Sequence, residues 1–190
     1  MPSDHLFAVL SDTHVGDRSS CLHPAMVQAI RDCHPEEIWH AGDVGDPSVL
    51  KQLGDIAPVQ VVQGNRDWFN RLDLPKVLQF EINSVKITLT HGHISMSRYA
   101  FNYLRLLVTF HKLSYDRFQK YLARLYPESD LIIYGHTHYQ VDEIVYGQHF
   151  INPGAAYPHR LNNYTVQYCL LTITSTGKVQ VLKKTIHPTA

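Results

Sequence analysis

Seven side chains of the metal-binding type follow short apolar runs in this chain of 190 residues. They stand in the segments "SDTH", "GDVGD", "GNRD", "THGH" and "YGHTH". Carboxylates, imidazoles and amide oxygens are ligands of hard to borderline divalent metals, and two adjacent ions would need about this many ligands, with one carboxylate shared. The pattern predicts a site for two divalent metal ions. The candidate ligands are Asp12, His14, Asp43, Asn65, His91, His136 and His138.

Two of these segments supply two ligands each. Residues two apart in an extended segment point to the same side, so we expect Asp12 with His14, and His136 with His138, to face the site together. Glycine next to most of the ligands allows the backbone to turn sharply and to crowd around an ion. Each strand tip would therefore contribute a compact pair of donors.

The elements that must position these residues are mostly short strands. Buried strands that end at the motifs are predicted by the apolar runs at 6–10 and 131–134 and by the segments "EEIWH" and "PVQVV". The strand "PVQVV" is expected to end in a polar loop, "GNRD". Alternation on both sides of Asn83-Ser84 predicts a hairpin whose second strand ends in "THGH". Further hairpins are expected around Gly147 and "STG".

Helical patterns lie between the early strands. Apolar spacing from Leu22 to Cys33 predicts one helix, and Asp46-Pro47 is typical of the start of a short helix that runs through Leu53. Residues 97–126 are helical in pattern and rich in aromatic residues, with a break near Ser114 and a stop at Pro127. Early strands that alternate with helices and later hairpins favour an α/β sandwich of two mixed sheets, in one domain over residues 1–190.

Composition excludes several classes of function. Lys plus Arg equals Asp plus Glu at 17 each, so no overall field attracts nucleic acid. The three cysteines are widely spaced, which favours free thiols in a reducing compartment. No secretory leader and no apolar run of about 20 residues is present, so we expect a cytoplasmic chain without a membrane span.

The ordered set of five motifs resembles the calcineurin-like metallophosphoesterase superfamily, over residues 6 to roughly 175. The length and the later "NPGA" are similar to its small bacterial and archaeal phosphodiesterase branch. The resemblance implies a four-layer α-β-β-α sandwich with two metal ions at one edge. It assigns Asp12, His14 and His138 to one ion, Asn65, His91 and His136 to the other, and Asp43 to both.

The resemblance also implies a reaction, the hydrolysis of a phosphodiester in a small-molecule substrate by in-line attack of a hydroxide that bridges the two metals. Mn is the expected metal, with Fe, Zn, Co or Ni as alternatives. Many family members have histidine after the motif asparagine as general acid, whereas this chain has Arg66, which cannot give up a proton but can hold a phosphate oxygen. His93 is a candidate for the missing acid. The expected catalytic residues are Asp43, Asn65, Arg66 and His93.

Two other functions stay open. Arg66 after Asn65 is similar to a pyrophosphatase of the same superfamily, so a nucleotide-linked pyrophosphate is an alternative substrate. A retromer subunit with this fold is a protein-binding scaffold, so the fold alone does not establish catalysis. The helical segment 97–126 could serve as core, as a cap over the site or as a homodimer contact. Asp17 and Asp67 are expected to brace loops, and His40, Asn152 and Arg160 to pack or shape turns near the site.

Overall fold

The computed structural model describes residues 3–92 and 115–187, and the first of its two sheets contains the N-terminal strand. The order in this sheet is β10-β9-β1-β2-β3. β1 and β2 are parallel, with Val9 opposite Trp39, and β3 continues parallel to β2. β9 runs antiparallel to both β1 and β10. The strands are β1 (His5–Leu10), β2 (Glu37–His40), β3 (Val59–Val61), β9 (Val166–Ile173) and β10 (Val179–Ile186).

The second sheet is also mixed and has the order β4-β5-β6-β8-β7. β6 lies between β5 and β8 and is parallel to both, while β4 and β7 are antiparallel edge strands. The carboxyl ends of the parallel strands β5 and β6 therefore point the same way, toward the loops that carry the histidine motifs. The strands are β4 (Val77–Ile82), β5 (Val85–Thr90), β6 (Leu131–Tyr134), β7 (Gln140–Val145) and β8 (Gln148–Pro153).

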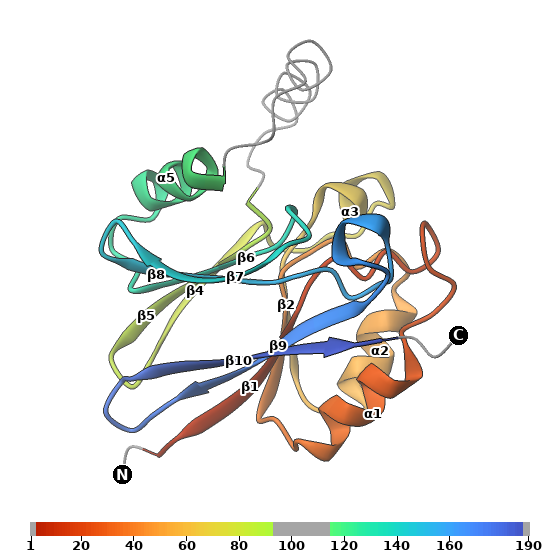
Figure 1. Cartoon of the computed structure of the whole chain (residues 1–190), viewed down its shortest axis with the longest axis horizontal. Helices are drawn as coiled ribbons and strands as arrows, with labels where there is room; N and C mark the ends of the chain where they lie inside the picture. Colours follow the sequence, from red (N-terminus) through yellow and green to blue (C-terminus); the bar gives the residue numbers. More distant parts are fainter. Residues whose placement is uncertain (1–2, 93–114, 188–190) are drawn as a thin grey trace.

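Helices cover the outer faces of the two sheets. Figure 1 shows α1 and α2 against the first sheet and α5 against the second, with the sheets between them. α1 (Pro24–Asp32) buries Met26, Val27 and Ile30, and α2 (Ser48–Gly54) buries Val49 and Leu53. The other helices in the described residues are α3 (Asn65–Phe69), the 3-10 turn η1 (Arg160–Asn162) and α5 (Tyr115–Leu125).

Among the described residues, three hydrophobic clusters lie between the four layers. Alternation along β1 sends Leu10 into the cluster under α1 and α2, and sends Val9 into the cluster between the sheets. β6 divides in the same way, since Ile133 faces the other sheet while Ile132 packs against Leu122 of α5. The predicted α-β-β-α sandwich is confirmed.

Most of the predicted helices and strands are confirmed, although some begin or end at other residues and the helix α3 was not predicted. α1 begins at Pro24 rather than at Leu22, because proline occupies the first turn. The polar loop predicted after β3 is wrong, since "GNRD" opens the five-residue helix α3. α5 ends before Pro127, as predicted, but residues 97–114 of the predicted helix lie outside the described residues.

Within the described ranges, no helix is both long enough and apolar enough to cross a membrane.

Candidate metal centre

The backbone at the candidate ligands has an unusual conformation. Asp12, His14, Asp43, His136 and His138 all have positive φ, between 48° and 69°. Residues other than glycine rarely adopt this left-handed region, and clusters of such residues are typical of functional sites. The expectation that each pair two residues apart lies on an extended segment is therefore wrong. The loops turn at each ligand, and it is this turning that directs both members of a pair to one place.

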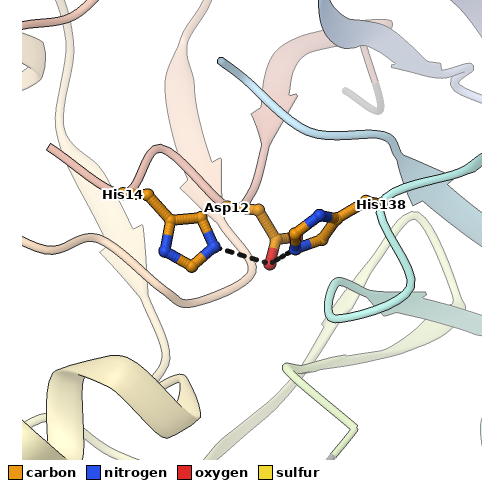
Figure 2. A group of neighbouring side chains, drawn as sticks. All are labelled: Asp12, His14 and His138. Atoms are coloured by element: carbon orange, nitrogen blue, oxygen red, sulfur yellow. Dashed lines mark ion pairs between the residues drawn. The ribbon is translucent and has the colours of Figure 1, made fainter. Parts of the chain in front are cut away.

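One group of donors consists of Asp12, His14 and His138 (Figure 2). Oδ1 of Asp12 lies 3.1 Å from Nε2 of His138 and 3.8 Å from Nε2 of His14. Ser11 Oγ and the backbone N–H of His136 donate to the other oxygen, Oδ2, at 2.7 and 3.1 Å. Oδ2 is thus occupied by hydrogen bonds, whereas the buried Oδ1 and both ring nitrogens of His14 have no hydrogen-bond partner in the part of the chain that the structure describes.

A second group surrounds the amide oxygen of Asn65. This Oδ1 atom lies 3.1 Å from Nε2 of His91 and 3.1 Å from Nδ1 of His136. Nδ1 of His91 is 2.7 Å from the carbonyl oxygen of Ala41 and must donate to it, so a neutral His91 turns the lone pair of Nε2 toward Asn65. Two acceptors then face each other, and a proton or a metal ion is needed between them.

Asp43 joins the two groups. Its Oδ2 atom lies 3.5 Å from Nε2 of His14 and 3.6 Å from Nε2 of His91. Asp12, Asp43 and His91 also form a set whose ligand atoms lie within 4.8 Å of one another. The geometry and the unpaired buried donor atoms fit two adjacent cations that share the Asp43 carboxylate.

Hydrogen bonds and close packing hold the loops together. The buried carboxylate of Asp67 accepts from the backbone N–H groups of Asp43, Gly45 and Gly64 at 2.9, 3.0 and 2.8 Å. A Cβ at Gly135 would lie 2.7 Å from the carbonyl oxygen of Ala41 and 2.9 Å from Nδ1 of His91, so only glycine fits there. Asp67 braces the loops, as predicted.

Burial and charge set the protonation states in the centre. Burial lowers the pKa of His14 to about 3 and raises the pKa of Asp43 to about 6. Burial alone would raise the pKa of Asp12, but His138, His91 and His14 together hold that pKa below its ordinary value. For His91, burial opposes protonation, yet the carboxylates of Asp43 and Asp12 outweigh it and raise the pKa. Buried carboxylates beside a neutral His14 require compensating positive charge.

The outer edge of the centre contains residues that the sequence analysis missed. The ring of Tyr157 contacts His14 with ring centroids 5.1 Å apart, and its hydroxyl accepts a 2.9 Å hydrogen bond from Nη1 of Arg18. His159 stacks on Tyr157 and meets His138 edge-on. The sequence signal for Tyr157 and His159 was their position shortly after "NPGA". The corresponding signal for Arg18 was its position four residues after "SDTH", in an irregular loop.

The other residues that the sequence pointed to have structural contacts, lie on the surface or fall outside the described residues. His40 is buried, and its Nδ1 accepts from the backbone N–H of Gly42 at 3.2 Å. Asn152 donates to the carbonyl oxygen of Gly135 at 2.8 Å and so supports the "GHTH" loop. Arg160 is exposed in η1. The candidate acid His93 is outside the described residues.

Two mixed sheets between helices, with nitrogen and oxygen donors gathered at the strand ends, define a metal-binding α/β sandwich protein. The chain belongs to the calcineurin-like phosphoesterase superfamily, because the model of the calcineurin-like phosphoesterase superfamily domain matches residues 6–176. The resemblance noted in the sequence is thereby confirmed.

Relatives of known name and structure agree with this assignment. A probable metallophosphoesterase from Methanothermobacter thermautotrophicus is 34% identical over 161 residues, which cover 85% of this chain and 83% of the relative. Zinc-bound Vps29 from Entamoeba histolytica has a TM-score of 0.66 at 22% identity, with 95% and 98% of the two chains covered. A structure described as a novel archaeal phosphodiesterase has a TM-score of 0.62 at 22% identity, with 94% and 99% covered. These two structures share the fold.

Proposed function

We propose that this chain is a metal-dependent phosphodiesterase with a dinuclear centre. The observation that carries the proposal is the position of Asp43, whose Oδ2 lies between Nε2 of His14 and Nε2 of His91. A carboxylate placed between two sets of nitrogen and oxygen donors is the arrangement that two adjacent divalent ions need. Burial of these carboxylates and imidazoles costs free energy that bound cations would offset, and a scaffold protein has no physical reason to bear that cost.

Each ion has a proposed set of ligands, and Mn is the metal that we expect, with Fe, Zn, Co or Ni as alternatives. When bound, the ions would supply Lewis-acid activation of the phosphoryl group and a water of lowered pKa. Asp12, His14 and His138 would hold one ion, Asn65, His91 and His136 the other, and Asp43 both.

The protein's own residues bind and orient the substrate in this proposal. Arg66 follows Asn65 in α3, and its backbone N–H donates to Oδ1 of Asp43 at 2.7 Å, so its guanidinium starts from a fixed point beside the centre. That guanidinium would hold a non-bridging phosphate oxygen. His93 is the proposed proton donor to the leaving group, on the basis of the sequence alone.

A covalent intermediate on the protein is the poorer alternative. Ser11 Oγ lies 2.7 Å from Oδ2 of Asp12 and 3.0 Å from the carbonyl oxygen of Gly154, so its proton is already engaged. Cys169 is buried in the core between the sheets, and burial raises the pKa of its thiol to about 12. Neither side chain is a suitable nucleophile.

The test compares bis-p-nitrophenyl phosphate with p-nitrophenyl phosphate on chelator-stripped protein to which Mn is restored. The proposal predicts diester cleavage that depends on metal and exceeds monoester cleavage. Asp43→Asn, which keeps the size of the side chain but removes its charge, should lower the rate roughly 100-fold or more, because even residues that only orient metal ligands are worth 10–100-fold. Metal binding without cleavage of either ester would favour the pyrophosphatase alternative, whereas a protein that binds no metal would favour the scaffold alternative.

The aromatic segment 97–126 leads to a separate proposal, that the chain forms a homodimer through it. Eight phenylalanines and tyrosines in this segment exceed what one helical face of a monomer needs. Sedimentation equilibrium at micromolar concentration should give the mass of a dimer. The mass of a monomer, 21.8 kDa, would refute the proposal.

A further inference from the structure

Beside the metal centre, two arginines meet at one carboxylate. Oδ2 of Asp17 lies 3.5 Å from Nε of Arg66 and 3.7 Å from Nε of Arg18. The same Oδ2 is 3.5 Å from Nδ1 of His14. Asp17 therefore contacts both guanidinium groups and the candidate metal ligand His14.

Arg18 has a second fixed contact. Its Nη1 donates to the hydroxyl of Tyr157 at 2.9 Å, and the ring of Tyr157 packs edge-on against His14. Arg18 thus reaches the edge of the centre from the loop after β1, and Arg66 reaches it from α3. Two anchors on a long flexible side chain reduce the entropy that it would lose on binding a ligand.

Both guanidinium groups keep N–H donors beyond those that contact Asp17 and Tyr157. In the described parts of the chain, no hydrogen bond or ion pair uses either Nη atom of Arg66 or Nη2 of Arg18. The side chains of Arg66 and Arg18 are 38% and 40% exposed, so both are partly accessible to solvent at the edge of the site. The two guanidinium groups share the one carboxylate of Asp17, so Asp17 alone does not neutralise them.

This charge exceeds what one scissile phosphate requires. The proposed metal ions already neutralise the oxygens of the phosphate that reacts, and Arg66 offers a further fork. A second guanidinium, held in place by Asp17 and Tyr157, matches a second phosphate group joined to the first. A diester of a single phosphate has no such group.

We propose that Arg18, beside Arg66, forms a subsite for a second phosphate, so that the favoured substrates are pyrophosphate-linked diesters. This inference rests on the proposed function, because it takes the metal centre to be where the first phosphate reacts. Arg18 binds the second phosphate directly. Tyr157 and Asp17 position the guanidinium of Arg18.

The test uses two substrates without a nucleoside, P1,P2-diphenyl pyrophosphate and bis-p-nitrophenyl phosphate, with Mn-loaded protein. Hydrolysis of the pyrophosphate is followed by 31P NMR. Arg18→Gln should raise KM for the pyrophosphate about tenfold and change kcat less than threefold, while KM for the single-phosphate diester changes less than threefold. Arg18→Lys should recover part of the loss, and Tyr157→Phe should raise only the pyrophosphate KM, about threefold. The matched control is Arg31→Gln, in the last turn of α1, which should change neither KM.

A binding measurement makes the inference independent of turnover. Calorimetry with P1,P2-diphenyl methylenediphosphonate, which is not hydrolysed, and with diphenyl phosphate is made on metal-free and Mn-loaded protein. Arg18→Gln should weaken binding of the diphosphonate about tenfold and leave diphenyl phosphate within threefold. Equal losses for both ligands, or no loss for either, would overturn the subsite. If wild-type protein cleaves neither substrate, the proposed function fails, and the calorimetry alone decides whether the subsite exists.

Discussion

At the scale of single residues, the centre stores conformational strain. Five of the candidate ligands have left-handed backbone, each at a cost of about 1–2 kcal/mol for a residue other than glycine. The surrounding hydrogen bonds must offset that cost, and the buried carboxylate of Asp67 is the clearest example, since it accepts from three backbone N–H groups. The ligand types could be predicted from the sequence. Their backbone conformation could not, because it depends on neighbours distant in the chain.

Asp67→Asn tests this bracing. An amide has one acceptor oxygen in place of two, and its NH2 group would face backbone donors, so we expect unfolding to become easier by roughly 3 kcal/mol. We also expect affinity for Mn to fall about 10-fold or more, as for other residues that orient ligands. Urea denaturation and Mn titration measure the two effects. Asp55→Asn, at an exposed carboxylate after α2, is the control and should be nearly neutral; an unchanged midpoint for Asp67→Asn would show that the loops hold without it.

His40 gives the fold a dependence on pH. Burial lowers the pKa of this imidazole from 6.5 to about 4, and its Nδ1 is occupied by the N–H of Gly42. Between these two values the unfolded chain binds the proton and the folded chain does not, so the stability contributed by the neutral ring is present above pH 6.5 and is lost as the pH falls toward 4.

The check is urea unfolding of wild type and His40→Gln from pH 8 to pH 4.5. Wild type should lose more stability than the variant over this interval, although the variant starts lower. Parallel curves would mean that His40 does not cause the loss.

At the scale of elements, the periodic patterns in the sequence predicted the helices and strands that bury an apolar face and missed the helix that does not. The strands and α1 bury a regular face, and the signals for them were clear. α3 was missed because it has only five residues and exposes its apolar ones, with Trp68 and Phe69 at 50% and 58% exposure. A short helix without a buried apolar face leaves no periodicity to detect. Arg18 and Tyr157 were missed for the same reason, since irregular loops carry them.

α5 allows a matched test of the fourth layer. Leu122 is fully buried against Ile132, Tyr134 and Phe150, whereas Leu125 in the same helix is 40% exposed. Leu122→Ala should destabilise the fold by about 2–5 kcal/mol through the cavity that it leaves. Leu125→Ala should cost under about 1 kcal/mol, because it removes less buried surface. Similar urea midpoints for the two variants would contradict the packing of α5 on the second sheet.

At the scale of the whole molecule, the layered core decides where the chemistry lies. The hydrophobic cluster between the sheets fixes β1 and β2 against β5 and β6, and the loops after these four strands carry Asp12, Asp43, His91 and His136. The sequence could predict that these loops follow strands. That loops from two different sheets converge follows only from how the sheets stack. Because charges balance over the chain, recognition of an anionic substrate must come from local groups such as Arg66.

The most direct test of the central claim is a titration of metal-free protein with Mn, in which hydrolysis of bis-p-nitrophenyl phosphate is measured at each addition. Two ions that share Asp43 predict activity that rises to a plateau at about two equivalents of Mn per chain and is abolished again by chelator. A plateau at one equivalent, or hydrolysis that persists in the metal-free protein, would contradict a dinuclear phosphodiesterase.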